Sequence, residues 1–450
     1  MKGKSVRIGA GAAYEMDRVA PAALLAEHGN IQYLCFETLA ERTLGFAHLR
    51  RREDPSAGFN PMTEERMRAV LPACARNGVK IITSMGAANP HGAAEVTLRV
   101  ARELGITGLK VAVVLGDDIK HLVTPEMRIW ETDGPLGDLD GELISANAYV
   151  GAEPIVAALE RGADVVITGR VADPSLFLAP MMYELGWRAD DWDHLGPGTI
   201  IGHLLECTAL VSGGLYYDPG SNDGVPDMAH IGYPIAEVYE DGEAVISKVD
   251  GTGGMVTPTT CKAQLLYELH DPSAYLTPDV TADFRNVRFD ELGKDKVRVS
   301  GGAGRERPKD LKVLAGVLEG YIGEGEISWA GPGCYEKAQA AAEAAKTNLE
   351  PMMDRIDELR VDFMGVNSIF GPTAPEPAAA PNEVRLRIAG RTRSHEVAFK
   401  IGQEVELKIH DGPVGGGGIR SSVRPCLSMY STLIPREQVA EEVSVEMQTA

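Results

Sequence analysis

The sequence predicts an α/β protein with an N-terminal doubly wound, mostly parallel sheet and a C-terminal α+β domain built on a mixed sheet. Two observations carry this expectation. In residues 1–185, short apolar runs alternate with helix-like stretches, and apolar strands joined by crossover helices form a parallel sheet covered on both faces. After residue 285, strand-like runs are interrupted by few helical stretches, which favours a mixed sheet with helices on one face.

The N-terminal elements follow from the alternation of apolar and amphipathic runs. The expected strands are Val6–Gly9, Gln32–Phe36, Lys80–Thr83, Lys110–Leu115 and Asp164–Thr168. The expected helices between them are Ala20–His28, Thr63–Asn77, Gly92–Leu104 and Ala152–Arg161.

The later elements are less regular. A helix near Leu204–Leu210 and a strand Ala244–Lys248 belong to a connecting region. Further on we expect a hairpin at Val287–Val299, strands at Lys309–Val317, Glu358–Met364, Val384–Ile388 and Glu404–His410, and a helix at Gly333–Thr347.

The chain of 450 residues is too long for one ordinary hydrophobic core. We expect three segments: a Rossmann-like α/β domain at 1–185, an irregular connecting and ligand-binding region at 186–285, and an α+β domain with a glycine-rich loop at 286–450. The Pro- and Ala-rich run Ala374–Pro381 is expected to be a surface loop.

Composition excludes several classes of protein. A net charge of −21 disfavours nucleic-acid binding, because phosphate neutralisation needs a basic surface. The first residues carry no apolar signal core, and no apolar run has the length of a membrane span. The six cysteines are scattered without a CxxC pair, which disfavours a disulfide framework or a zinc ribbon. A cytoplasmic protein that binds neither nucleic acid nor membrane is expected.

Polar side chains gather near the carboxyl ends of the predicted strands, where open parallel sheets bind ligands. They are Glu37, Asn89, Asn147, Arg170 and Asp173. We expect them to line one cleft, with Arg170 clamping a carboxylate or phosphate through its guanidinium fork. The alternatives are helix capping by Asn89 or Asp173 and an Arg170–Asp173 ion pair that only pins the loop.

His203 and Glu206 lie three residues apart in GHLLEC and so share one face of a helix. Together with Glu37 they are the candidate acid–base groups. A purely structural hydrogen bond between the two is the alternative.

Two glycine-rich stretches expose successive backbone N–H groups, which can hold an anion. Gly253 and Gly254 represent the first stretch, and Gly416 and Gly417 the second. The alternative is a mobile lid or a hinge.

Cofactor signals are incomplete. The turn Gly9–Tyr14 resembles a dinucleotide fingerprint, but Tyr14 occupies its third glycine position. The loop residues Tyr217, Asp218, Asn222 and Asp223 offer oxygen ligands for a divalent cation without matching an EF-hand. No cofactor is therefore assigned, and a divalent metal is left open.

At these same positions the chain resembles the acyclic terpene utilisation protein A (AtuA-like) family. The matching stretches run from Val6 to about Arg424 and are LCFETLAERTL, SMGAANPHGAAE, ANAYVGAEPIVAALERGADVVITGRVADPSLFLAPMMYELGW, GHLLECTA, GYPIAEV, GTGGMVTPTT, LHDPSAYLTPDVTADF and DGPVGGGGIRSS.

The resemblance implies a role in breaking down terpenes and branched carboxylic acids, often as CoA thioesters. It also implies a small ferredoxin-like-fold domain, fused or separate. Since such a domain is not found up to Ala450, a separate small partner is expected, docking on an apolar patch near Cys426–Ile434. A physical motive is that Pro435–Ala450 looks like a helix or tail with little to pack against.

Three functions follow as expectations. The first is an enzyme for a small carboxylic acid or its acyl-CoA thioester, of the hydratase or dehydratase (lyase) kind, forming a homo-oligomer. The second is a non-catalytic ligand-binding or scaffold subunit completed by the small partner. The third is an NAD or flavin oxidoreductase, which rests on the Gly9–Tyr14 turn alone.

Overall fold

Five short apolar strands form the parallel centre of the main sheet. The computed structural model describes residues 3–221, 224–375 and 380–450. The central strands, in sheet order, are β1 (Ser5–Ala12), β2 (Tyr33–Phe36), β3 (Lys80–Thr83), β6 (Val165–Thr168) and β4 (Lys110–Leu115). This agrees with the predicted strands, which lie within two or three residues of these bounds.

Antiparallel strands extend the sheet on both sides. Beyond β1 lie β7 (Pro234–Tyr239), β8 (Ala244–Lys248), β12 (Lys296–Ser300) and β11 (Arg288–Gly293). Beyond β4 lies β18 (Ser444–Thr449). The expected α/β class is confirmed, but the main sheet is mixed: only its centre is parallel. The hairpin expected in the C-terminal domain is the β11–β12 edge of this sheet.

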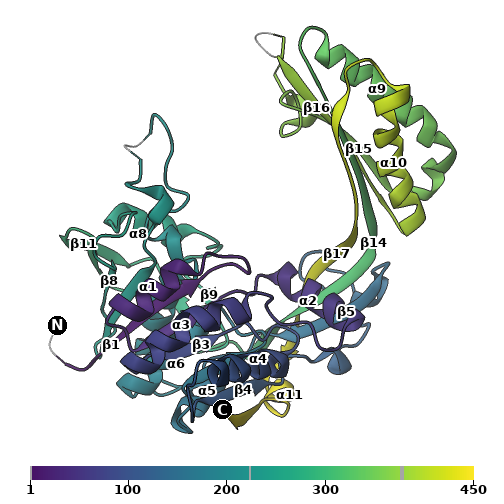
Figure 1. Cartoon of the computed structure of the whole chain (residues 1–450). Helices are drawn as coiled ribbons and strands as arrows, with labels where there is room; N and C mark the ends of the chain where they lie inside the picture. The colour runs from purple at the N-terminus through teal and green to yellow at the C-terminus, as the bar shows by residue number, and fades with distance from the viewer. Residues whose placement is uncertain (1–2, 222–223, 376–379) are drawn as a thin grey trace. The chain divides into compact units, whose positions relative to one another are not determined.

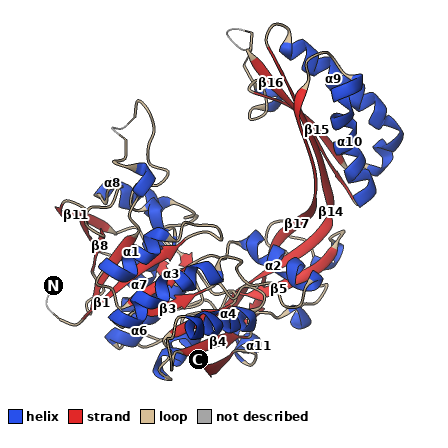
Figure 2. Ribbon diagram, viewed as in Figure 1, coloured by secondary structure: helices blue, strands red, loops and turns tan. Residues whose placement is uncertain are grey.

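Helices cover both faces of the parallel centre (Figures 1 and 2). On one face pack α1 (Ala20–His28), α3 (Thr63–Asn77) and α4 (Pro90–Glu103). On the other pack α5 (Glu153–Glu160), α6 (Ser175–Leu185) and α7 (Trp192–Glu206).

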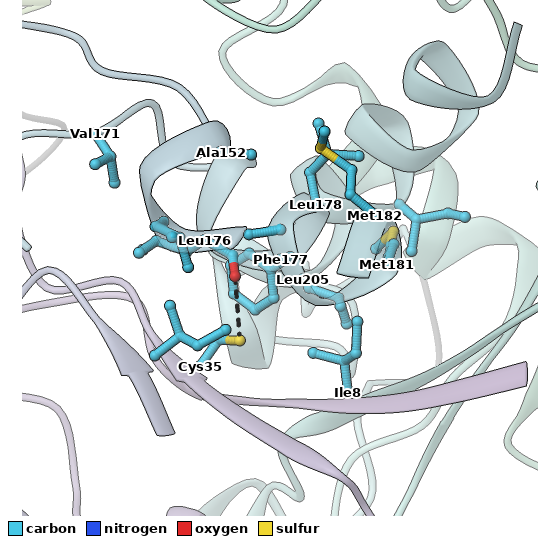
Figure 3. Close-up of a cluster of buried hydrophobic side chains, with 14 of the residues drawn as sticks. Ile8, Cys35, Ala152, Val171, Leu176, Phe177, Leu178, Met181, Met182 and Leu205 are labelled. Atoms are coloured by element: carbon cyan, nitrogen blue, oxygen red, sulfur yellow. Dashed lines mark hydrogen bonds between the residues drawn. The ribbon is translucent and has the colours of Figure 1, made fainter. Parts of the chain in front are cut away.

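Alternation along the central strands explains the two cores. In β6, Val165 and Ile167 belong to the core under α1, α3 and α4, whereas Val166 belongs to the core under α5, α6 and α7. Successive strand side chains point to opposite faces, so a strand covered on both sides must be apolar throughout. Figure 3 shows part of the second core, where the Cys35 thiol donates to the Leu176 carbonyl at 3.4 Å.

Smaller elements complete this region. Helix α2 (Glu41–Glu53) follows β2, β5 (Glu142–Ala148) precedes α5, and α8 (Pro258–Leu266) follows β8. A separate sheet contains β13 (Ala303–Arg305), β10 (Thr281–Asp283) and β9 (Tyr275–Leu276). The short helix α11 (Arg436–Ala440) precedes β18.

The chain divides into two compact units, neither of them continuous in sequence. The first comprises 1–138, 144–315 and 429–450, and the second 139–143 and 316–428. This differs from the expected consecutive segments 1–185, 186–285 and 286–450. The difference arises because β11, β12 and β18 pair with the N-terminal strands, and pairing between distant segments leaves no local trace in the sequence.

The second unit is an α+β arrangement. Its sheet has the order β15 (Glu358–Met364), β16 (Glu383–Thr392), β14 (Asp310–Ala330), β17 (Gly417–Pro435), and β14 and β17 each begin or end in the first unit. Helices α9 (Cys334–Leu349) and α10 (His395–Asp411) pack on one face through a core that includes Trp329, Leu386 and Ile401.

One expected strand is a helix. Glu404–His410 lies in α10, although its apolar and polar residues alternate as in a strand. Ser394 caps this helix by accepting a hydrogen bond from the Val397 N–H. Val397, Ile401 and Val405 then repeat every four residues and are fully buried against the sheet. The segment forms a helix because the four-residue repeat puts these apolar side chains on one face, which the sheet buries.

The sequence predicted that Pro435–Ala450 is a helix or tail with little to pack against. The structure shows instead that these residues pack against the main sheet. Ser444–Thr449 pairs antiparallel with β4 from Ser444–Leu115 to Thr449–Lys110. Cys426–Ile434 lies within β17, where Leu427 and Ile434 are buried and Leu433 is 45% exposed. The physical motive for a partner is therefore removed, and the separate small partner stays a prediction.

Within the described residues, no helix combines the length and the apolar character that crossing a bilayer requires.

Candidate functional site

The ends of the parallel strands bring polar residues together, including Glu37 and Arg170 from the predicted set. Glu37 follows β2, Ser84 follows β3, Asp117 follows β4, and Arg170 follows β6. The Ser84 hydroxyl approaches Glu37 Oε1 at 3.4 Å, and Arg170 Nη2 lies 3.9 Å from the same oxygen. These contacts place Glu37 at the centre of the carboxyl edge of the sheet.

Glu37 is a buried carboxyl group whose proton is held tightly. Its side chain is 8% exposed, and its Oε1 accepts the Leu39 backbone N–H at 2.7 Å. Burial, followed by the negative charge of Asp173, raises its pKa to about 8, although Arg170 acts in the opposite direction. At neutral pH this group is mainly protonated and is a potential proton donor.

Arg170 is committed to its own loop. Its Nε donates to the Val171 carbonyl at 2.8 Å, and its two terminal nitrogens donate to the carbonyls of Leu39 and Val171 and to the carboxylate of Asp173. The guanidinium carbon also lies 4.6 Å from the ring centre of Tyr149. Because the side chain is 1% exposed, this arrangement matches the alternative in which Arg170 pins the loop. Its charge still acts on Glu37 and Asp173.

Asn147 enters the site through Asp117. The Asn147 amide donates to Asp117 Oδ2 at 2.8 Å, and the Arg170 backbone N–H donates to the same oxygen at 2.8 Å. Asn147 Oδ1 also lies 2.9 Å from His48 Nε2. Burial raises the pKa of Asp117 to about 6 and lowers that of His48. His48 was missed because no helix was expected over Glu41–Glu53, where it lies, and a single histidine carries no signal by itself.

His203 and Glu206 form a buried pair on α7. His203 Nδ1 lies 2.7 Å from Glu206 Oε1, and Nε2 lies 3.3 Å from the Leu265 carbonyl oxygen. Burial opposes the imidazolium, but the negative charge of Glu206 raises the net pKa of His203. Burial raises the pKa of Glu206 to about 7, while His203 lowers it. The pair can therefore exchange a proton near neutral pH.

The carboxyl groups near Arg170 and the carboxyl group of Glu206 influence one another's pKa values. The charge of Glu206 contributes to raising the pKa of Glu37, and the charge of Asp173 contributes to raising the pKa values of both. We call Glu37, Asp173 and Glu206 the carboxyl cluster. Asp173, with 36% of its side chain exposed, is its most accessible member.

Two residues beside the carboxyl cluster, Tyr275 and Glu268, were not predicted from the sequence. The ring of Tyr275, on β9, lies 5.4 Å from the His203 ring, and its pKa is raised by burial and by the charge of Glu206. Burial and Asp173 raise the pKa of Glu268, which follows α8 and has a φ of 56°. A non-glycine residue in this left-handed region was a signal available only from the structure.

Asn89 does not join these residues by a hydrogen bond. Its side chain caps α4 by accepting the Gly92 N–H at 3.0 Å and donates to the Ala57 carbonyl at 2.9 Å. The capping alternative therefore describes Asn89.

The two glycines named for the first stretch, Gly253 and Gly254, use their N–H groups within the fold. The Gly253 N–H donates to the His230 carbonyl at 2.8 Å, and the Gly254 N–H to the Pro226 carbonyl at 2.7 Å. Gly416 and Gly417 belong to the second unit, where a Cβ on Gly416 would lie 3.2 Å from the Trp329 ring. Gly416 thus serves packing.

The incomplete dinucleotide fingerprint at Gly9–Tyr14 does not form a strand-to-helix turn. Gly9 and Gly11 lie inside β1, and α1 begins only at Ala20. A Cβ on Gly11 would approach the Phe36 ring to 2.6 Å, so this glycine is needed for packing between β1 and β2. The strand-to-helix turn that would cradle a pyrophosphate is missing at this position.

The metal hypothesis finds no support in the described residues. No group of three or more His, Cys, Asp or Glu side chains within 3–221, 224–375 and 380–450 is arranged to hold a metal ion. Asp218 instead accepts a hydrogen bond from the Ser221 hydroxyl at 2.5 Å. Two further candidates, Asn222 and Asp223, lie outside the described residues.

Comparison with known families decides the relationship that the motifs suggested. The model of the acyclic terpene utilisation family protein AtuA matches residues 6–445. The chain belongs to this family. A search of curated proteins finds no significant match to the sequence. Family membership links the chain to acyclic terpene utilisation, and the matched range includes every member of the carboxyl cluster.

Proposed function

We propose that this family member is a hydro-lyase that adds water to, or removes it from, a branched carboxylic acid or its CoA thioester during terpene breakdown. The observation that carries the proposal is Glu37, a buried carboxyl group that keeps its proton at neutral pH. It lies at the carboxyl edge of a parallel sheet, where ligands bind in such folds.

Two carboxyl groups with different proton affinities suit this chemistry. Hydration needs one group that takes a proton from water and another that gives a proton to carbon. Glu37 and Glu206, with pKa values of about 8 and about 7, meet this requirement near neutral pH. Neither step requires a hydride carrier, which distinguishes the proposal from the oxidoreductase alternative.

The test is incorporation of ¹⁸O from labelled water. The purified chain is incubated with branched α,β-unsaturated acids and, separately, with their CoA thioesters, and the products are analysed by mass spectrometry. Glu37→Gln should lower the rate on the order of 10²–10⁴-fold, the usual contribution of a positioned acid. Glu53→Gln, an exposed carboxyl at the end of α2, serves as the control and should keep full activity.

The outcome also discriminates between the alternatives. No labelled product with either substrate class contradicts the hydro-lyase proposal. Activity that arises only when the small ferredoxin-like partner is added favours the scaffold-subunit alternative.

A further inference from the structure

The two oxygens of Glu206 have different surroundings. Oε1 is bound to the imidazole of His203 at 2.7 Å. Oε2 is buried and has no hydrogen-bond partner within the described residues. A buried carboxylate oxygen without a donor costs free energy, and the residue as a whole is only 5% exposed. Oε2, unlike Oε1, therefore keeps its capacity to accept a hydrogen bond from a donor that the described residues do not supply.

His203 has no free nitrogen with which to meet a ligand. Nδ1 is occupied by Glu206 and Nε2 by the Leu265 carbonyl. The rings of Tyr275 and Phe284 lie 5.4 and 5.5 Å from the imidazole, whose side chain is completely buried. The Gln264 amide holds the backbone by donating to the His203 carbonyl at 2.9 Å. Both ring nitrogens and two neighbouring rings thus hold the imidazole in place.

We propose that Glu206 is the general base of the site, accepting a proton from water through Oε2, and that His203 is a positioning residue. This assignment rests on the proposed function and deepens it. It names which member of the pair touches the reacting water.

The proposed hydration step conserves atoms and electrons. A water O–H bond breaks, its proton passes to Glu206 Oε2, and the water oxygen bonds to the β-carbon of the unsaturated acyl group. The π electrons of the C=C bond form a new C–H bond at the α-carbon with the proton from Glu37. Glu37 is then ionised and Glu206 protonated, and exchange with solvent restores both groups. Dehydration follows the same path in reverse.

The charges around Glu206 fix the direction of its titration. The groups that act on it are His203 on its own helix and Asp173 and Glu268 from neighbouring loops. Glu37, Cys207 and Tyr275 are also coupled to its charge. Among the named groups only His203 lowers the pKa of Glu206. Replacing His203 by a neutral residue must therefore raise that pKa.

The test combines rates with a titration that needs no substrate. In the full chain, Glu206→Gln should lower the hydration rate on the order of 10²–10⁴-fold. His203→Gln should cost about tenfold at pH 7, recoverable in part at higher pH because the rising limb of the pH profile moves upward. The protonated carboxyl band of Glu206, assigned in the infrared spectrum by its loss in Glu206→Gln, should persist to higher pH in His203→Gln.

The matched control lies on the same helix. His194 Nδ1 contacts Asp191 Oδ2 at 2.7 Å, also three residues apart, but both side chains are about one-third exposed. His194→Gln should leave the rate, its pH profile and the Glu206 band unchanged.

Two results would overturn the assignment: an active Glu206→Gln variant, or a Glu206 titration that His203→Gln leaves where it was. An inactive wild-type chain would instead count against the proposed function, while the infrared titration would still decide whether His203 sets the proton affinity of Glu206.

Discussion

Arg170 and Glu37 show how a single buried charge organises the residues around it. The guanidinium satisfies carbonyls on two loops and the carboxylate of Asp173, and it moderates the proton affinity of Glu37. A lysine keeps the charge but loses the planar fork that reaches several acceptors at once. The residue therefore contributes to the position of Glu37 and to stability together.

We expect Arg170→Lys to destabilise the first unit by about 3 kcal/mol, since one ammonium cannot reach all the acceptors that the fork joins, and each buried carbonyl left without a donor costs about 1–3 kcal/mol. Urea unfolding of the variant and the wild type measures this change. The matched control is Arg188→Lys, because Arg188 pairs with Asp190 through two bonds of 3.0 Å at an exposed position. Equal stability of Arg170→Lys and the wild type would show that the loop does not depend on the guanidinium.

Asp173 acts on both carboxyl groups of the proposed acid–base pair. Its charge raises the pKa values of Glu37 and Glu206. Asp173→Asn should therefore lower both pKa values and move both limbs of the pH–rate profile to lower pH. Initial rates measured between pH 5 and pH 10 give the shift, because this range brackets the pKa values of Glu206, about 7, and Glu37, about 8. Limbs that stay in place would mean that Asp173 is screened from the cluster.

Gly169 is a position where a side chain has no room. A Cβ there would lie 2.4 Å from Asp117 Oδ1 and 2.5 Å from Oδ2, the oxygen that holds Arg170 and Asn147. We expect Gly169→Ala to displace this carboxylate and to cost about 1–3 kcal/mol. Gly134→Ala, which meets only a side-chain oxygen at 3.6 Å, should be neutral in the same thermal unfolding experiment.

At the scale of elements, β18 closes one edge of the main sheet. It pairs with β4 over six residues, and an uncovered edge strand is prone to intermolecular pairing. Removing Ser444–Ala450 should therefore lower solubility, measured as the soluble fraction and by light scattering. Met447→Lys, at a side chain 37% exposed, keeps the backbone bonds and should remain soluble. A soluble, monodisperse truncation would show that β4 needs no cover.

Helix α10 illustrates how an element is decided by what it packs against. The segment EVELKIH fits a strand by its alternation, but Ser394 begins a helix ten residues earlier and its apolar side chains match the face of the β14–β16 sheet. By contrast, β3 and β4 were predicted with their exact bounds. A short apolar run rich in β-branched residues between helical stretches is typical of a buried strand.

At the scale of the whole molecule, the buried carboxyl groups make stability depend on pH. Folded pKa values of about 8 for Glu37 and about 7 for Glu206 lie above those of an unfolded chain, near ~4.3. The folded state then binds more protons than the unfolded state, and stability falls as pH rises through these values. His203, with a raised pKa, acts in the same direction. His48, with a lowered pKa, acts oppositely only below ~6.5.

We therefore expect the melting temperature to fall between about pH 6.5 and pH 8. Differential scanning calorimetry across this range gives the slope. Glu37→Gln removes one of the titrating groups and should flatten the slope, whereas Glu53→Gln at the surface should not. A melting temperature that rises through this range would show that the carboxyl cluster is ionised when the chain folds.

The sequence by itself determined the α/β class, the central strands, most of their helices and the family. These depend on local apolar periodicity and on contiguous motifs such as the one from Ala146 to Trp187. It also placed Glu37, Arg170 and Asp173 among the candidates, because polar groups gather near the ends of the predicted strands. It added His203 and Glu206 because their spacing puts both on one face of a helix.

Only the tertiary structure decided which partners those residues have. The Arg170 fork is occupied, the Gly253 and Gly254 donors are used, and Asn89 is a cap, although the local sequence permits other roles. Glu268 and Tyr275 come beside the carboxyl cluster from distant segments. The physical reason is that a proton affinity or a free hydrogen-bonding group depends on burial and on charges brought near by folding, and neither quantity is a property of neighbouring residues in the chain.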